Sequence, residues 1–234
     1  MRIWEQFPRL VLVTRLAHEK YAADIVHHDF DHALQVALVA VEVAEEPETS
    51  RLAGAAGLCH NADRMLEERT DGKVKKAEPA AIERLIREWL AVEPFSEEEK
   101  WHIVEAVLEH SKPNNDKDSP TTVALKDADR IICLGLDVVV RGAQDHNCPT
   151  VDPWLLYDDT RGKYGRRESI VKVLQECLEW ASDDRLFGVR LPKSKVLAKE
   201  RAGAIQWYVD TAIAQRQKLG LVPYPLPRLS SEAA

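Results

Sequence analysis

The stretch LQVALVAVEVA, residues 34–44, indicates the fold class of this chain, because its apolar residues recur at the three- and four-residue spacing of a helix. The segments AAIERLIREWL (80–90) and WHIVEAVLEH (101–110) repeat this spacing. The strict alternation of a half-buried strand is almost absent. The sequence therefore predicts an all-α protein.

Helix-start signals agree with this prediction. Pro79 can open a helix, Ser96-Glu97-Glu98-Glu99 has the capping-box pattern, and Ser119-Pro120 precedes another apolar run. That run starts at Val123 and continues through the β-branched residues 138–140, which we therefore predict as helix. Two more amphipathic helices are expected near 166–181 and 194–219.

The connections and the tail set the expected domain organisation. Residues 67–76 form a charged connection that contains Asp71-Gly72, and 142–165 is long for a compact domain, which is typical of a functional segment or a lid. Residues 221–234 hold three prolines and end in small residues, so they favour an extended, partly disordered tail. We expect one domain over 1–220 followed by this tail.

Composition and charge narrow the partners. The chain has 234 residues, 45% of them hydrophobic, and 32 basic against 39 acidic side chains give a net charge of −7. Such a molecule repels nucleic-acid duplexes and anionic lipid. Four dispersed cysteines indicate reduced thiols, and the N-terminal apolar stretch is too short to span a membrane. We expect a cytoplasmic protein, and whether it forms a homo-oligomer stays open.

Three clusters of histidines and carboxylates accompany the predicted helices. The first, HHDFDH at 27–32, directly precedes the first apolar helix. If that helix extends back far enough, His28, Asp29 and His32 share one face and could form a metal corner. The alternative is a solvated N-terminal cap made by Asp29 or Asp31.

The second cluster, LCHNADR at 58–64, follows a helix of small apolar residues that can pack closely against its neighbours. His60 would project from this largely buried helix, so its ring nitrogens need partners. Either a metal ion or a backbone carbonyl satisfies them.

The third cluster, ALKDADRII at 124–132, places two carboxylates in an apolar helix. At about 100° per residue Asp127 and Asp129 point in different directions, so at most one is expected to face the interior. The other is solvated or supports the first. For either carboxylate the alternative is a surface ion pair with Lys126 or Arg130.

Together the clusters resemble the HD-domain superfamily of metal-dependent phosphohydrolases, whose ligands follow the order H…HD…D. His32, His60 and Asp129 reproduce that order. The segments HDFDHALQVALVA (28–40), IVEAVLEHS (103–111) and PKSKVLAKERAGAIQWYVDTAI (192–213) also resemble parts of its small bacterial members. The resemblance implies an all-α, HD-domain-like helical bundle around one or two divalent cations.

The resemblance also implies a set of site residues. The metal ligands would be His32, His60, Asn61 and Asp129, with His110 lining the pocket or holding a second ion. This mixed set leaves the cation open among Mn, Mg, Co, Fe, Ni and Zn. Candidates to hold a phosphate are Lys126 and Arg130, Arg64, and the basic group Arg161, Lys163, Arg166 and Arg167.

The chain departs from the family at Asn61, where the family has the aspartate of its HD doublet. An amide attracts a cation less than a carboxylate does and cannot act as a general base. Asp63, about 60° round a helix from His60, could restore the charge. A surface salt bridge with Arg64 or Arg69 is the alternative for Asp63.

Three functions follow from the resemblance. The first is a metal-dependent phosphohydrolase that acts on a nucleotide or another small phosphomonoester through a metal-activated water. The second is a catalytically degenerate HD module that binds a nucleotide or a protein partner without turnover, as Asn61 would allow. The third is a two-metal oxygenase, which requires His28 and His110 as ligands.

Overall fold

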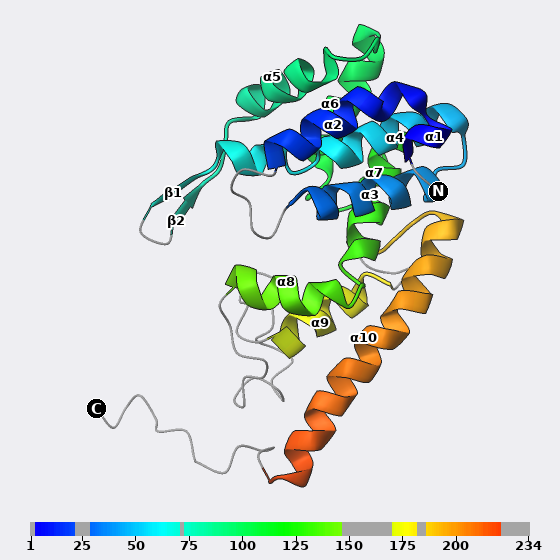
Figure 1. Ribbon diagram of the computed structural model, residues 1–234. Helices are drawn as coiled ribbons and strands as arrows, with labels where there is room; N and C mark the ends of the chain where they lie inside the picture. Colours follow the sequence, from blue (N-terminus) through cyan, green and yellow to red (C-terminus); the bar gives the residue numbers. More distant parts are fainter. Residues whose placement is uncertain (1–2, 22–28, 71–72, 147–169, 182–185, 221–234) are drawn as a thin grey trace.

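The computed structural model of this protein describes residues 3–21, 29–70, 73–146, 170–181 and 186–220 (Figure 1). The prediction of an all-α fold is confirmed, with one small hairpin added. In chain order the elements, with η marking 3-10 helices, are α1 (Ile3–Gln6), η1 (Pro8–Leu10), α2 (Val11–Tyr21), α3 (Phe30–Val43), α4 (Pro47–Cys59), η2 (Ala62–Leu66), β1 (Glu68–Thr70), β2 (Lys73–Lys75), α5 (Pro79–Leu90), α6 (Glu97–Glu109), α7 (Pro120–Ile132), α8 (Asp137–His146), α9 (Ile170–Glu179) and α10 (Pro192–Lys218).

Helices α3, α4 and α7 form the centre of the molecule, and each packs against the other two. The small residues of α4 allow this close approach: a Cβ added to Gly57 would lie 2.5 Å from the Cα of Ala37 on α3. The two backbones are therefore in direct contact. Helix α6 packs on α4 and α7, and α2 and α5 cover the same bundle (Figure 1).

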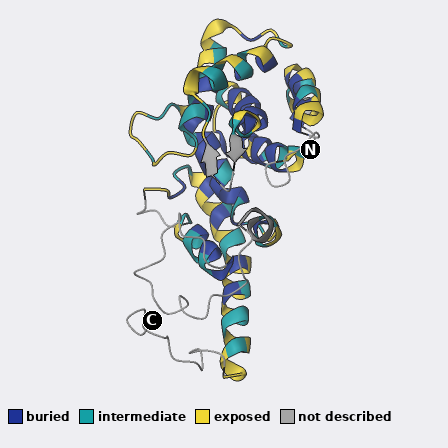
Figure 2. Cartoon of the chain, turned by 90° about the vertical axis from the view of Figure 1, so that its left-hand side faces the viewer, coloured by how far each residue is buried: buried dark blue, intermediate teal, exposed yellow. Residues whose placement is uncertain are grey.

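Helices α8, α9 and α10 form a second layer below the bundle (Figure 1). Val138, Val171, Leu174 and Ile205 are buried in a smaller apolar cluster of their own, and the half-buried Leu178 packs on both clusters. The last turns of α10 expose most of their residues (Figure 2). The two helices expected near 166–181 and 194–219 are thus found as α9 and α10.

The predicted start signals are confirmed. Pro79 is the first residue of α5. Ser96 Oγ accepts a hydrogen bond from Glu99 N, and the Glu99 carboxylate accepts one from Ser96 N, which completes the capping box of α6. Ser119 caps α7 by accepting from Thr122 N at 3.3 Å.

The structure differs from the predicted helix pattern in two places. The run from Val123 to residue 140 is broken, because α7 ends at Ile132 and α8 starts at Asp137. Leu134 N and Gly135 N donate to carbonyls three residues back, so the chain tightens into a turn there. The charged connection 67–76 contains the antiparallel pair β1 and β2, with Arg69 opposite Val74. In the sequence, the dipeptide Asp71-Gly72, a common signal for a hairpin, separates the two strands.

The expectations for the long connection, the tail, the cysteines and membrane spans can be compared with the structure only where it describes the chain. Helix α8 continues to His146, whereas 147–165 of the expected long connection and the tail 221–234 lie outside the described residues. Among the described residues, Cys59, Cys133 and Cys177 form no disulfide, and burial raises the pKa of Cys59 to about 12. Within the described ranges, no helix is both long enough and apolar enough to cross a bilayer.

Candidate metal centre

Three side chains from the central helices meet at one point. His32 comes from α3, His60 directly follows the last residue of α4, and Asp129 comes from α7. The Nε2 atoms of the two histidines are 3.2 Å apart, and Asp129 Oδ1 lies 3.6 Å from His32 Nε2 and 3.9 Å from His60 Nε2. Ligand atoms about 2.1 Å from a divalent cation lie about 3.0 to 3.4 Å from one another. The cluster therefore fits a metal ion with little adjustment, and it is a candidate metal centre.

The N-terminus of α3 fixes His32. Asp29 caps the helix, and its Oδ1 accepts a hydrogen bond from His32 N at 2.9 Å. The predicted cap at Asp29 is confirmed, and it coexists with His32 as a candidate ligand. The side chain of His32 is only 2% exposed. His28, the other histidine of the predicted metal corner, lies outside the described residues.

A backbone carbonyl orients His60. Its Nδ1 is 2.7 Å from Gly57 O, and because a carbonyl only accepts, Nδ1 carries the proton. Nε2 then keeps its lone pair and points to His32 and Asp129. A histidine that binds a metal usually has this arrangement, with one ring nitrogen free and the other N–H donating to a carbonyl or carboxylate. The backbone carbonyl considered as a partner of His60 is thus found at Nδ1, and Nε2 is available to a metal ion. Burial, assisted by His110, lowers the pKa of His60 to about 4, although Asp129 opposes the shift.

The two carboxylates of α7 have different surroundings. Asp129 is 27% exposed and joins the cluster, whereas Asp127 is completely buried. Asp127 Oδ2 accepts hydrogen bonds from Arg190 N at 2.9 Å and Leu191 N at 2.8 Å, directly before α10. The prediction that at most one of the two faces the interior is confirmed: Asp127 is the buried one, paired with backbone donors of the segment that leads into α10, and Asp129 stays partly exposed.

Asn61 and Asp63 lie beside the cluster. Asn61 is 2% exposed, and its Nδ2 donates to no other described residue. Helix α4 ends at Cys59 and a 3-10 turn follows, so the α-helical angle expected between His60 and Asp63 does not apply. Asp63 does not join the cluster of His32, His60 and Asp129. Its buried Oδ1 has no hydrogen-bond partner in the described part of the chain. Compensation by Asp63 stays a prediction.

Two further residues adjoin the cluster. The ring of His110 lies 5.5 Å from that of His60, edge to face, and its Nδ1 is 2.6 Å from Val107 O. Arg141, on α8, places Nη1 2.8 Å from Nδ1 of His32. Sequence reasoning missed Arg141, because no motif links it to residues more than a hundred positions away.

Lys126 and Arg130, predicted to hold a phosphate, have other partners. The completely buried Lys126 donates from Nζ to both Asp118 oxygens and to Pro113 O. Arg130 donates to Asn114 Oδ1 and to the Gly188 carbonyl, and burial lowers the pKa of Arg130 to about 10. Within the described residues neither side chain contacts His32 or His60. Lys126 joins α7 to residues 113–118, and Arg130 joins it to residues 112–114 and 187–188.

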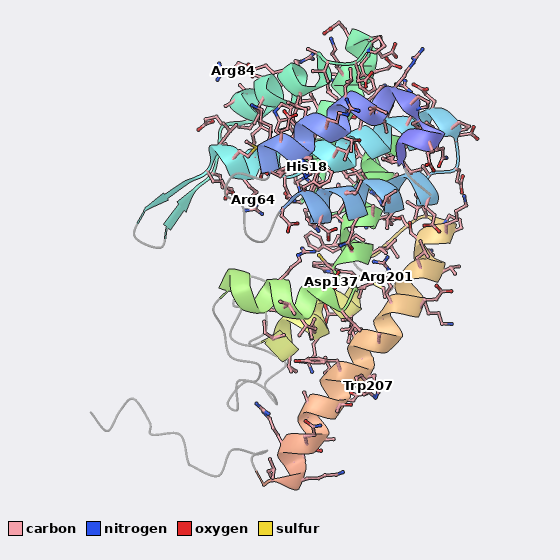
Figure 3. The ribbon with its side chains drawn as sticks, viewed as in Figure 1. His18, Arg64, Arg84, Asp137, Arg201 and Trp207 are labelled. Carbon is pink, nitrogen blue, oxygen red and sulfur yellow. The ribbon has the colours of Figure 1, made fainter. Side chains whose placement is uncertain are left out.

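Of the other basic residues predicted to hold a phosphate, Arg64 has another partner, and the rest lie outside the described residues. Arg64, labelled in Figure 3, donates to Glu67 at 3.0 Å, so this arginine forms its salt bridge with Glu67 and not with Asp63. The side chain of Arg69, the alternative partner of Asp63, is outside the described part. Four further candidates also lie outside it: Arg161, Lys163, Arg166 and Arg167.

Comparisons with known proteins agree with this geometry. Residues 29–133 match the family model of the HD domain. A Lactobacillus plantarum structural-genomics protein superposes with a TM-score of 0.65 at 20% identity, covering 91% of this chain and 98% of that one. A Listeria innocua protein reaches 0.62 at 12% identity, with 93% and 98% covered. Bacillus subtilis YpgQ, solved in complex with ADP, reaches 0.56 at 14%, with 90% and 96% covered. No curated protein gives a significant match.

Proposed function

We propose, from the match of residues 29–133 to the HD domain, that this protein is a metal-dependent phosphohydrolase that hydrolyses a nucleotide or another small phosphomonoester. The observation that carries the proposal is the cluster of His32, His60 and Asp129, whose ligand atoms all lie within 4.8 Å of one another. HD domains bind divalent metals, and this cluster offers two imidazole nitrogens and a carboxylate to such an ion.

The chain's own residues prepare the site. Gly57 O holds the His60 ring with Nε2 free, and Asp29 fixes the turn that carries His32. Asp129 adds a negative charge at the partly exposed side of the cluster, where a substrate can approach. A divalent cation bound there would neutralise charge on a phosphoryl group and make a water molecule more acidic.

A small phosphorylated molecule is the best-supported class of substrate. The net charge of −7 disfavours nucleic-acid duplexes, and the half-buried Arg141 guanidinium adjoins His32. Guanidinium groups are common ligands of phosphate oxygens. The similar Bacillus subtilis protein was solved with ADP, so nucleotides are the first substrates to test.

Asn61 favours a second candidate, an HD module that binds a nucleotide without turnover. The residue after His60 is a neutral amide, buried, with an Nδ2 that has no hydrogen-bond partner among the described residues. The third function, a two-metal oxygenase, depends on His28 and His110; only His110 is described, and it lies next to the cluster.

The test combines metal analysis with hydrolysis assays. We would measure bound metal in the purified wild type and in the variants His60→Ala and Asp129→Ala. The control is His102→Ala, at a half-buried position on α6. Each protein is then assayed on a panel of nucleotides and phosphomonoesters with each candidate cation. We expect metal and turnover in the wild type and the control, and neither in the two cluster variants. Turnover that survives either cluster substitution would refute the proposal.

Asn61→Asp separates the two candidates. If the wild type hydrolyses a substrate, the amide is tolerated and the enzyme proposal stands. If the wild type binds a nucleotide but only Asn61→Asp turns it over, the binding module is the better account.

A further inference from the structure

The buried carboxylate of Asp127 attaches α7 to the start of α10. Its Oδ2 accepts hydrogen bonds from two consecutive backbone N–H groups, those of Arg190 at 2.9 Å and Leu191 at 2.8 Å. Leu191 is the cap residue of α10, and its own side chain makes no capping hydrogen bond. A carboxylate from another helix therefore supplies the acceptor at this helix start, where a negative charge is also favourable. None of Asp127 is exposed to solvent.

Arg201 attaches α10 to α7 a second time. Its guanidinium Nη1 donates to the backbone carbonyl of Ile131 at 3.3 Å, in the last turn of α7. A Cβ built on Gly135, in the turn that follows, would lie 3.7 Å from the same nitrogen. The Arg201 side chain, labelled in Figure 3, therefore reaches from α10 to the end of α7.

The candidate ligand Asp129 lies between these two attachments, two residues from each of them along α7. Because a helix turns about 100° per residue, the side chain of Asp129 leaves α7 about 160° away from that of Asp127. It leaves toward the histidines of the cluster, and its Oδ1 is 3.6 Å from His32 Nε2 and 3.9 Å from His60 Nε2. A contact that holds the Asp127 side of α7 therefore also determines how far Asp129 reaches.

A small movement of α7 is enough to matter for a metal ion. A carboxylate oxygen about 5 Å from the helix axis moves by about 1 Å when the helix rotates by about 10°. Distances between a metal ion and its ligands hold to within about 0.2 Å. The rotation of α7 must therefore be fixed more closely than 10° if Asp129 is to bind the same ion as the two histidines.

We propose that Asp127 and Arg201 are positioning residues of the candidate metal centre, and that they hold α7 where Asp129 reaches the ion. This inference deepens the proposed function and rests on it. The partners of α7 in both attachments, the segment 190–191 and α10, lie outside residues 29–133, the stretch that matches the HD domain. The C-terminal layer thus takes part in the site, although the three residues of the cluster all come from the central helices.

The first measurement is the zinc affinity of Asp127 variants. Each protein is stripped of metal with a chelator and titrated by calorimetry at a temperature at which its near-UV circular dichroism shows it folded. Asp127→Ala should bind zinc about tenfold more weakly, the low end of the range for groups that orient a metal ligand. Asp127→Asn keeps an oxygen that can accept from both N–H groups, so it should recover most of the affinity. Wild-type affinity in Asp127→Ala would overturn the inference.

The second variant tests the other attachment and does not depend on how well Asp127→Ala folds. Arg201→Met removes a single 3.3 Å hydrogen bond from a half-buried side chain and should weaken zinc binding about threefold, the effect of one weak hydrogen bond. Lys199→Met removes the same charge from an exposed position on the same helix and should leave the affinity unchanged. Equal zinc affinity in these two variants would refute the role of Arg201.

A third comparison separates positioning from a general loss of stability. Lys126→Met also removes a buried contact of α7, but its partner Asp118 lies in the loop before that helix, so α10 stays attached. Its zinc affinity should equal that of the wild type. The visible spectrum of the cobalt(II)-loaded protein should change in Asp127→Ala and stay unchanged in Lys126→Met, because only the first displaces the carboxylate. A loss of zinc affinity that follows stability alone in both variants would overturn the inference.

Failure of the proposed function gives a different result. If the wild type binds no more zinc than His60→Ala does, the metal centre and the proposed function are both refuted. If zinc binding depends on His60 but not on Asp127 or Arg201, only the present inference is refuted.

Discussion

Replacing Lys126 tests whether this buried lysine stabilises the fold or serves the metal centre. Its Nζ lies 2.8 Å and 3.0 Å from the two Asp118 oxygens and 2.9 Å from Pro113 O, and none of the residue is exposed. Lys126→Met keeps most of the side chain's length and apolar contact but removes the ammonium group. The Asp118 carboxylate is then left with Arg190, whose Nη2 donates at 2.7 Å, and with Asn115 N, which donates at 3.1 Å.

The expected loss follows from that remaining partner. Removing one member of a buried ion pair costs about 3 to 5 kcal/mol, because the other charge stays buried without compensation. The Asp118 side chain is only 4% exposed, but Arg190 still neutralises it, so we expect the lower end, about 3 kcal/mol. For a chain of this size that loss lowers the Tm by about 6 to 12 °C.

Urea unfolding followed by circular dichroism measures the stability, and a zinc titration measures the metal centre. The control is Lys112→Met, which breaks an ion pair with Glu109 whose lysine side chain is 57% exposed, and it should change the free energy of unfolding by no more than about 0.5 kcal/mol. Zinc affinity should be unchanged in both variants. The reasoning is refuted if Lys126→Met unfolds like the wild type, or if it keeps its stability and loses zinc binding.

Two other predictions concern the central helices. Gly57→Ala places a Cβ 2.5 Å from Ala37 Cα, so α3 and α4 must separate; we expect a loss of about 3 kcal/mol in thermal or urea unfolding and weaker zinc binding through His60. Gly203→Ala, whose Cβ meets nothing within 4 Å, should not destabilise, and equal stability of the two variants would contradict this argument. The second concerns pH: the unfolded His60 takes up a proton near pH 6.5 and the folded one only near pH 4, so acid favours unfolding. Between pH 7 and pH 5 the metal-free protein should lose about 2 kcal/mol from this group; a His60→Gln variant with the same pH dependence would argue against it.

Local sequence features predicted most of the fold. Apolar spacing identifies the helices around 34–44, 80–90 and 101–110, and the caps at Asp29, Ser96 and Ser119 depend only on residues within one turn. The break at 133–136 was missed, because the apolar spacing continues through it while the backbone hydrogen bonds do not. The hairpin around Asp71-Gly72 was missed because its two strands have only three residues each.

The sequence also predicted only part of the candidate site. The order of His32, His60 and Asp129 along the chain was informative, and the structure brings these three together. Lys126 and Arg130 could not be assigned from sequence, since a charged residue in an apolar helix fits a ligand site and a buried ion pair equally well. The Asp118 and Asn114 partners that decide between the two come from a separate loop. Arg141 could not be predicted, because it is linked to the site only by its contact with His32 in the folded chain.

The three candidate ligands come from α3, from the end of α4 and from α7, and this origin also affects how the protein is made. During synthesis His32 and His60 leave the ribosome well before Asp129, so the early chain exposes two histidines without the carboxylate that completes the centre. Contacts between distant segments form late, because chain entropy opposes them until the helices have docked. A cation that met the nascent chain would find only loosely held imidazoles. We therefore expect a divalent ion to bind this cluster only after the helices have docked.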